Sequence, residues 1–415
     1  MKRDKLAVIV VLLGTLVRFF RLPELASFSY EQALALEASG QMVQTGKLSL
    51  IGVEYFIRQT STGHSFFNSA FYLYPLAIMQ KLFGFDPLVT TVLFTVLNIL
   101  SGIGLYLVVR RYFTPVAAKT ALTLFMFSPI MVNISRSIWH VYLLVPVTVC
   151  SIWLLYTSTR TPKPVWFGLL GVVLGFGFGL NISYVLALMT GLIMCSFILY
   201  QKHKLGYLIY LLLGMVLGNL PTVIFDLRHN FYNTYTFATF LSEMFSGTKT
   251  GFSFEPYHFL YFLIPIFILI SIVITRQLSK RLVYSVLALY VLISIPGWHL
   301  TVKYPQGMPD GTNLQTLRHI SSIISQDSSS EFEVAAILDG ETRAENLRYF
   351  LTYVDHKLSM SADKYPEAKT LYVVSYLDQD PLTKSVWELD SIKPAKVARE
   401  WNINELIKLT KLEKL

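Results

Sequence analysis

The chain has 415 residues, of which 53% are hydrophobic and only 15% are charged. Soluble domains carry about 25% charged residues, so this composition excludes a soluble globular protein and indicates an integral membrane protein with several spans. The net charge of +9 does not indicate a nucleic-acid-binding protein, because the Lys and Arg residues gather in short segments between apolar runs.

Apolar runs begin close to the first residue and continue to about residue 300. The first run follows MKRDK and ends in VRFFRLPEL without a small-residue cleavage site, so we expect a retained signal anchor. Cys150 and Cys195 lie inside such runs, where we expect buried small residues rather than a disulfide or a metal pair. The runs lie at about 5–21, 66–83, 87–109, 115–134, 141–157, 165–183, 184–200, 205–225, 258–275 and 281–299.

The second run, residues 66–83, decides the topology. If all ten runs crossed the membrane with MKRDK inside, Arg110, Arg160 and the other short basic loops would lie outside, against the positive-inside rule. If 66–83 lies on the membrane surface instead, all of these loops move inside. The run contains Gln80 and a central Pro75, which is typical of an interfacial helix, although a kinked span is the alternative. We therefore predict an α-helical polytopic membrane protein with about nine transmembrane helices.

This topology places two larger segments on the outer side. The first outward loop covers residues 22–86 and is predicted to hold two interfacial helices, at about 29–46 and 64–83. Residues 304–415 are charged and contain short apolar segments such as EVAAILD and TLYVVSYLD, which predicts a small extracytoplasmic α/β domain. We therefore divide the chain into a transmembrane domain, 1–303, and a soluble domain, 304–415. The soluble domain is predicted to have helices at 312–325 and 342–355 and strands at 332–338 and 370–377.

Polar and aromatic side chains gather on the predicted outer side, next to the membrane. Taken singly, Arg136 could be a headgroup anchor, Trp139 an aromatic-belt residue and His140 a helix cap, and Asp226 could form a local ion pair with Arg228. Their shared face, together with an acid in the first loop, favours a functional site. The candidates are Glu31, Gln32, Arg58, His64, Arg136, Trp139, His140, Asp226, Arg228 and His229.

A carboxylate at headgroup depth has two chemical uses. Glu31 could act as the general base on an acceptor hydroxyl, or it could bind a divalent metal, and Glu24 and Glu37 are its rivals. Cations such as Arg228 could hold the phosphate of a lipid-linked donor and stabilise it as a leaving group. The sequence has no HExxH or CxxC spacing, no P-loop, no GxGxxG after a strand and no GxSxG, so no cofactor is certain.

Several segments together resemble a known family. They are FSYEQALALEASGQMVQTGKLSLIG after the first span, then KLFGFDP, VVRRYF, SPIMVNISRSIWH and IFDLRHNF, within about residues 5–300. The pattern resembles the C-type superfamily of membrane glycosyltransferases, and is similar to the protein O-mannosyltransferases and bacterial aminoarabinose transferases (glycosyltransferase family 39-like). The resemblance implies transfer of a hexose or pentose, with inversion, from a polyprenyl-phosphate sugar to a glycan, lipid or protein acceptor.

The resemblance also assigns a place to the acid. Similar proteins carry an acidic doublet, usually Asp-Glu, in the first outward loop, and Glu31 matches its first acid. Gln32 takes the place of the second acid, so one carboxylate stands where two are common. The family implies a multi-pass protein of the cell membrane with its active site on the extracytoplasmic face, and polyprenyl-phosphate sugar and membrane lipids as partners, without nucleic acid.

Two other functions are compatible with the sequence. A transporter or flippase for lipid-linked glycans would carry charges within several spans and internal repeats, which are not evident here. A non-catalytic relative that binds a lipid-linked glycan or a partner would tolerate Gln32. The sugar, the acceptor, the lipid length and the oligomeric state stay open.

Overall fold

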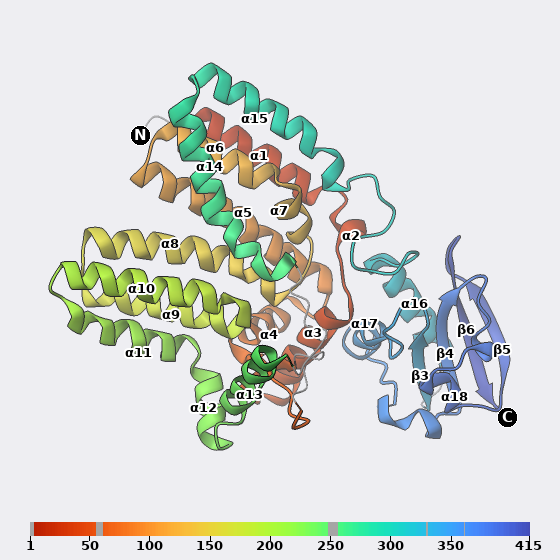
Figure 1. Cartoon of the computed structure of the whole chain (residues 1–415). Helices are drawn as coiled ribbons and strands as arrows, with labels where there is room; N and C mark the ends of the chain where they lie inside the picture. Colours follow the sequence, from red (N-terminus) through yellow and green to blue (C-terminus); the bar gives the residue numbers. More distant parts are fainter. Residues whose placement is uncertain (1–3, 55–60, 248–255, 329–330, 361) are drawn as a thin grey trace.

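The computed structural model describes residues 4–54, 61–247, 256–328, 331–360 and 362–415. Long helices lie side by side in one part of the molecule, and a small sheet lies at the other side (Figure 1). The helices of the first part are α1 (Lys5–Phe19), α5 (Pro87–Tyr112), α6 (Pro115–Phe127), α7 (Pro129–Ile134), α8 (Leu144–Arg160), α9 (Pro164–Leu180), α10 (Val185–Gln201), α11 (Leu208–Gly218), α12 (Leu220–Arg228), α13 (Tyr232–Ser246), α14 (Leu263–Gln277) and α15 (Lys280–Ser294).

By length and apolar composition, four described helical segments can cross a membrane: 87–112, 140–160, 182–201 and 257–277. A fifth is added if α11 and α12, which meet at an angle of 75°, form one broken span. Helices α6 and α9 are apolar but shorter. A polytopic helical membrane protein is therefore confirmed, whereas the number nine stays a prediction. Both cysteines are free; Cys195 is buried as expected, but Cys150 is exposed on α8, so its predicted burial was wrong.

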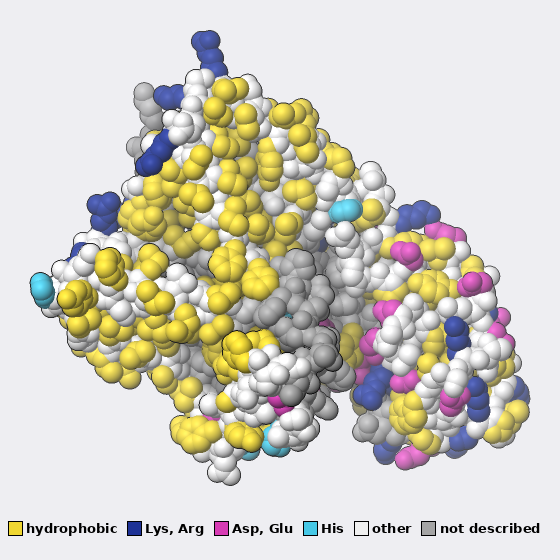
Figure 2. Space-filling model, in the orientation of Figure 1, with side chains coloured by type: hydrophobic (Ala, Val, Ile, Leu, Met, Phe, Trp, Pro, Cys, Tyr) yellow, Lys and Arg dark blue, Asp and Glu magenta, His cyan; other side chains and the backbone are white. Residues whose placement is uncertain are grey.

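The basic ends of the long helices lie together. The Lys202 ammonium after α10 donates to the carbonyl of Thr159 at the end of α8, and Tyr112 of α5 stacks on Tyr156 of α8 with 4.7 Å between ring centroids. At the start of α6, Lys119 lies 3.7 Å from Asp4. Figure 2 shows Lys and Arg side chains at this end, and both acidic and basic side chains over the sheet region on the opposite side. Basic short loops gathered at one end of the helices agree with the positive-inside rule.

The segment between α1 and α5 forms a layer across the ends of the helices. It contains α2 (Leu22–Leu25), α3 (Tyr30–Thr45), a two-stranded antiparallel sheet of β1 (Ile51–Glu54) and β2 (Phe67–Ser69), and α4 (Leu73–Phe83). Helix α3 matches the predicted helix 29–46. The predicted helix 64–83 begins later, at Leu73, because residues 67–69 pair with β1. The side-chain amide of Gln80 on α4 donates to the carbonyl of Leu36 on α3 (2.8 Å), which joins the two helices.

The last quarter of the chain builds a mixed four-stranded sheet. Its strand order is β3 (Phe332–Ala336), β4 (Thr370–Tyr376), β6 (Ile407–Lys414) and β5 (Ala395–Asn402), with β3 and β4 parallel and the other pairs antiparallel. The helices are α16 (Leu314–Asp327), α17 (Glu345–Tyr349) and α18 (Trp387–Asp390). The sequence prediction found β3, β4 and α16 but missed β5 and β6. The alternation of Ile407 and Leu409 with Lys408 and Thr410 at the start of β6 was the signal that could have found it.

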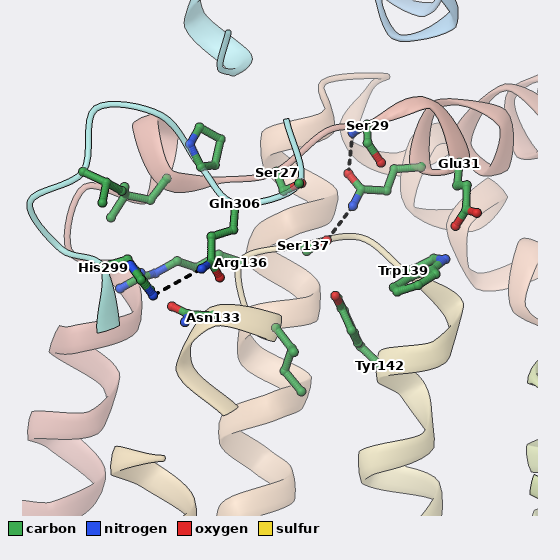
Figure 3. Close-up of a pocket in the computed structure, with 16 residues that line it drawn as sticks. Ser27, Ser29, Glu31, Asn133, Arg136, Ser137, Trp139, Tyr142, His299 and Gln306 are labelled. Carbon is green, nitrogen blue, oxygen red and sulfur yellow. Dashed lines mark hydrogen bonds between the residues drawn. The ribbon is translucent and has the colours of Figure 1, made fainter. Parts of the chain in front are cut away.

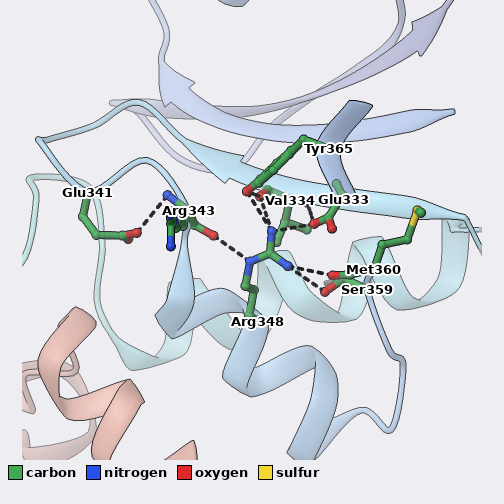
Figure 4. Close-up of polar contacts among 8 residues, drawn as sticks. All are labelled: Glu333, Val334, Glu341, Arg343, Arg348, Ser359, Met360 and Tyr365. Atoms are coloured by element: carbon green, nitrogen blue, oxygen red, sulfur yellow. Dashed lines mark hydrogen bonds and ion pairs between the residues drawn. The ribbon is translucent and has the colours of Figure 1, made fainter. Parts of the chain in front are cut away.

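Arg348 holds α17 against β3 (Figure 4). Its buried guanidinium forms an ion pair with Glu333 (2.5 Å), donates to the hydroxyl of Tyr365 (2.7 Å) and donates to the carbonyls of Arg343 (2.8 Å) and Met360 (3.0 Å). A buried ion pair is tolerated when such additional hydrogen bonds satisfy the charged groups. Arg348 therefore fixes the orientation of α17 relative to the sheet.

The opposite side of α17 and the turn that follows it dock on the α3–α4 layer. The hydroxyl of Tyr349 donates to the carbonyl of Phe85 (2.7 Å), and that of Tyr353 donates to the carbonyl of Glu37 (3.3 Å). The ring of Phe28, just before α3, packs edge-on against Tyr349 and Phe350, with centroids 5.5 and 5.8 Å apart. The sheet region and the first loop thus share one hydrophobic core. The division of the chain into a transmembrane domain, 1–303, and a soluble domain, 304–415, stays a prediction.

Candidate active site

A cavity of about 220 Å³ lies where the start of α3 meets the loop between α7 and α8 and the segment that follows α15 (Figure 3). Its wall therefore combines three parts of the chain that are far apart in the sequence. Leu25, Ser27, Ser29, Glu31, Gln32, Asn133, Ile134, Arg136, Ser137, Trp139, Tyr142, His299, Val302, Pro305, Gln306 and Gly307 line it.

Glu31 lies in the first turn of α3, at the cavity wall. The helix begins there because Ser29 and Gln32 form a capping box, in which each side chain bonds to the backbone of the other residue. The carboxylate is accessible from the cavity and points toward the indole of Trp139 (Figure 3). Protein atoms around the cavity displace water and raise the pKa of Glu31, and the nearby indole of Trp139 opposes this rise. Glu31 is therefore a stronger base than a glutamate surrounded by water on all sides.

Gln32 uses its amide inside the protein. Its oxygen accepts from the backbone N–H of Ser29 (2.9 Å), and its nitrogen donates to the hydroxyl of Ser137 (2.5 Å). The residue that replaces the second acid thus caps α3 and ties it to the loop between α7 and α8. Ser137 belongs to the same loop as Trp139, so the Gln32 bond joins the start of α3 to the loop that carries the indole.

Arg136 is a buried cation on the same cavity wall. Its guanidinium donates to the carbonyls of Val17 (2.6 Å) and Arg18 (3.3 Å) near the end of α1, and to the carbonyl of Trp298 (2.9 Å). Burial lowers the pKa of Arg136 to about 10, so it remains charged at neutral pH. A headgroup anchor would have an exposed guanidinium, so the three bonds to the backbone argue against that simple explanation. His299 lies nearby, with its Nε2 3.2 Å from the amide nitrogen of Gln306.

Trp139 and His140 are neighbours in the sequence but lie in different surroundings. The Trp139 ring packs against Tyr257 and Tyr142, with centroids 4.4 and 5.3 Å apart, and lines the cavity. His140 packs against the ring of Tyr72 (5.2 Å) and does not line the cavity. Of this predicted pair, the structure brings only Trp139 to Glu31.

The predicted residues on α12 lie apart from the Glu31 cavity. Asp226 caps α13, because its carboxylate accepts from the backbone N–H groups of Asn233 (2.7 Å) and Thr234 (3.1 Å). His229 bonds to the carbonyl of Phe225 in its own helix (2.8 Å). Arg228 is exposed. Arg228 and Asp226 both belong to the part of the chain that the structure describes, and no ion pair joins their side chains. The local ion pair considered as the alternative is therefore wrong.

Two further predicted residues belong to the first loop. His64 packs against the ring of Tyr232 at the start of α13, with centroids 4.8 Å apart, and so lies near α12 rather than near Glu31. Arg58 lies outside the described residues. The predicted single cluster is thus divided: Glu31, Gln32, Arg136 and Trp139 line one cavity, and the α12 residues lie elsewhere.

A second, apolar cavity of about 460 Å³ runs along α8, α9, α10 and α14. Phe113 and Tyr156 line it near the basic ends of the helices, and Tyr184 and Tyr261 line it near the opposite ends. Tyr261 lies about one helical turn after Tyr257, which packs on Trp139. The apolar cavity therefore ends close to the cavity that holds Glu31. Among the described residues, no group of three or more His, Cys, Asp or Glu side chains is arranged to hold a metal ion.

Comparisons with known proteins find a family match over part of the chain and a similar fold over nearly all of it. Residues 69–224 match the family model of dolichyl-phosphate-mannose-protein mannosyltransferase. The crystal structure of ArnT from Cupriavidus metallidurans bound to undecaprenyl phosphate is similar, with a TM-score of 0.63, 11% identity and coverage of 97% of both chains. The apo state of that protein gives a TM-score of 0.56, 12% identity and coverage of 98% of both chains. A comparison with curated proteins gives no significant match. The family match and the shared fold confirm the resemblance of this chain to the C-type membrane glycosyltransferases, near the protein mannosyltransferases and aminoarabinose transferases.

Proposed function

We propose that this protein is a membrane glycosyltransferase that moves a sugar from a polyprenyl-phosphate donor to an acceptor hydroxyl on the extracytoplasmic side, with inversion. The observation that carries the proposal is the position of Glu31. Its carboxylate lines a cavity that also holds the buried cation Arg136 and that adjoins the end of the apolar cavity between the long helices. A base, a cation and an apolar seat are the three parts that this reaction needs.

The reaction follows from this arrangement as a single displacement. The acceptor oxygen attacks the anomeric carbon while Glu31 takes the proton of the acceptor hydroxyl. The bond between the anomeric carbon and the phosphate oxygen breaks, and the polyprenyl phosphate leaves with the electron pair. One displacement inverts the anomeric centre. Burial raises the pKa of Glu31, which brings it closer to that of an effective general base at neutral pH.

The donor would lie along the helices with its phosphate at their outer ends. The apolar cavity along α8, α9, α10 and α14 suits a polyprenyl chain, because it runs from the basic ends of the helices to the vicinity of Trp139. Binding of undecaprenyl phosphate by the similar ArnT supports this class of donor. We propose that Arg136 faces the phosphate, and that Arg228 and His229, exposed on α12, contact the donor as it enters from the membrane.

A nine-span topology would place both the Glu31 cavity and residues 304–415 outside. The clustering of the basic helix ends on the opposite side supports it. Single cysteines at Thr62 and Asp378, both exposed, should react with an impermeant thiol reagent in intact cells, in a chain whose Cys150 and Cys195 are replaced. A cysteine at Thr161, in the short loop after α8, is the inside control. Protection of both outer positions would refute the model.

The decisive experiment is the substitution Glu31→Gln. General-base assistance contributes about 10²–10⁴-fold, so release of undecaprenyl phosphate from synthetic undecaprenyl-phosphate sugars should fall by roughly that factor while donor binding is retained. Glu24→Gln and Glu37→Gln are matched controls, because Glu24 pairs with Arg21 outside the cavity and Glu37 also lies on α3. If Glu31→Gln turns over normally and a control is inactive, the base is the other acid.

The second candidate function is a non-catalytic protein that binds a lipid-linked glycan. The observation that favours it is the single carboxylate: Gln32 replaces the second acid, and its amide is used inside the protein. A parent protein that binds undecaprenyl-phosphate sugars but transfers no sugar from any of them would establish this function instead.

A further inference from the structure

A small cavity of about 100 Å³ lies beside the break between α11 and α12, apart from the site described above. It is bounded by the end of α9, by β2, by α12 and by the start of α13. Two polar groups from the break line it, the amide of Asn219 and the hydroxyl of Thr222. A single buried water needs only about 10–15 Å³ of such space, so this α12 cavity has room for a larger group.

Thr222 is the unusual residue of this cavity. Threonines in the other helices donate to the carbonyl four residues earlier, as Thr95 (2.9 Å), Thr148 (2.7 Å) and Thr236 (2.7 Å) do. The 75° bend removes this partner from Thr222. Its side chain is buried, with 8% exposure, and its hydroxyl has no hydrogen-bond partner among the described residues; neither has the side-chain oxygen of Asn219. A buried polar atom without a partner costs about 1–3 kcal/mol, so the cavity is arranged for something that supplies one.

Aromatic rings form one wall of the α12 cavity, where Phe237 lies 5.8 Å from Phe66 and 6.0 Å from Phe178 between ring centroids. Ser69, Asp226, Asn233 and Thr234 also line the cavity, and the Asp226 carboxylate already accepts from the backbone N–H groups of Asn233 and Thr234. Gly179 keeps the space open, because a Cβ at this position would lie 2.6 Å from the side-chain oxygen of Asn219. Aromatic faces beside a hydroxyl and an amide oxygen suit a ligand with C–H groups on one face and hydroxyl donors at its edge.

We propose that the α12 cavity binds the hydroxyl-bearing edge of a sugar ring. A ligand hydroxyl donates to the side-chain oxygen of Asn219, a second pairs with the hydroxyl of Thr222, and the C–H face of the ring packs on Phe237. The sugar comes either from the lipid-linked donor or from the acceptor glycan, since both carry the same groups. The inference is independent of catalysis by Glu31, because binding alone satisfies the two buried oxygens.

The test measures sugar binding by the full chain in lipid nanodiscs, with Glu31→Gln as the background so that no turnover interferes. The probes are the methyl glycosides of mannose, glucose and arabinose, undecaprenyl-phosphate mannose, and undecaprenyl phosphate alone. Thr222→Val keeps the shape of the side chain and removes the hydroxyl, and should weaken sugar binding about ten-fold. Thr222→Ser should restore it. Thr239→Val is the matched control, because Thr239 lies on the exposed face of α13 and donates to the carbonyl of Tyr235 (3.0 Å).

The source of the sugar follows from which probe responds. If Thr222→Val weakens the methyl glycosides, the cavity holds acceptor sugar; if it weakens undecaprenyl-phosphate mannose but not undecaprenyl phosphate, the cavity holds the donor sugar. Removing a hydroxyl without a partner should leave the melting temperature of the ligand-free protein unchanged or raise it. The proposal is overturned if the parent binds none of the sugars, or if Thr222→Val binds them like the parent. A lower melting temperature with no sugar effect would show that the cavity holds only water.

Discussion

Helices α9 and α11 pack so closely that single methyl groups should separate them. Gly171 and Gly175 of α9 face Gly214 and Gly218 of α11, and small residues at such interfaces let the backbones approach, which is how helices associate in membranes. A Cβ at Gly171 would lie 2.1 Å from the carbonyl oxygen of Leu211. Gly171→Ala therefore places a methyl group against a backbone atom that no side-chain rotation can move.

The structure offers a control on the same helix. A Cβ at Gly168 would have as its nearest neighbour the carbonyl oxygen of Tyr210, at 3.8 Å, which is an ordinary contact. Both Gly168→Ala and Gly171→Ala gain helix propensity, about 0.8–1 kcal/mol each. Only Gly171→Ala is also destabilised by overpacking, which typically costs about 1–3 kcal/mol. Because the neighbouring backbone atom cannot move aside, we expect a cost at the upper end of this range. We therefore expect Gly171→Ala to be less stable than Gly168→Ala by about 3 kcal/mol and less stable than the parent by about 2 kcal/mol.

The assay is the apparent melting temperature of the purified proteins in one detergent at one heating rate, because membrane proteins commonly unfold irreversibly and only matched scans can be ranked. The expected order is Gly168→Ala at or above the parent and Gly171→Ala several degrees below it. If the two variants melt together, the close approach of α9 and α11 does not contribute to stability, and the reasoning from the glycine contacts is refuted.

Three other predictions concern the site and the sheet region. Burial raises the pKa of Glu31, and a general base must be deprotonated, so kcat/KM should fall on the acidic side at a higher pH than the usual glutamate value of about 4.3. Trp139→Phe removes the indole N–H beside Glu31 and should move this fall to still higher pH; an unmoved profile would show that Trp139 does not lower the pKa of Glu31. Arg348→Met leaves Glu333 buried without its cation and should lower stability by about 3–5 kcal/mol in thermal scans, with part of the loss recovered when Glu333→Leu is added; no recovery would mean that the other bonds of Arg348 dominate. Arg228→Lys should weaken use of the donor in kinetic assays, because Lys lacks the planar fork that suits phosphate, and unchanged donor kinetics would remove Arg228 from the proposed donor path.

Local patterns in the sequence determined much of the architecture. The apolar run 87–109 became α5 (Pro87–Tyr112), and the amphipathic segment 312–325 became α16 (Leu314–Asp327), because helix formation depends on residues three and four positions apart. The surface helix that carries Glu31 was predicted for the same reason, and in the structure Ser29 caps it. The basic residues of the short loops also predicted which ends of the helices lie together, because the positive-inside rule applies to each short loop by itself.

Tertiary structure alone decided which polar residues meet. His299 and Gln306 reach the Glu31 cavity from beyond the last long helix, and no spacing in the sequence marks them. Asp226 and His140, predicted at the same depth as Glu31, turn to α13 and to Tyr72 instead. Depth in the membrane follows from the order of spans, but the direction of a side chain depends on how each helix is rotated against its neighbours. That rotation is set by packing between residues far apart in the chain, which a pattern of neighbouring residues does not contain.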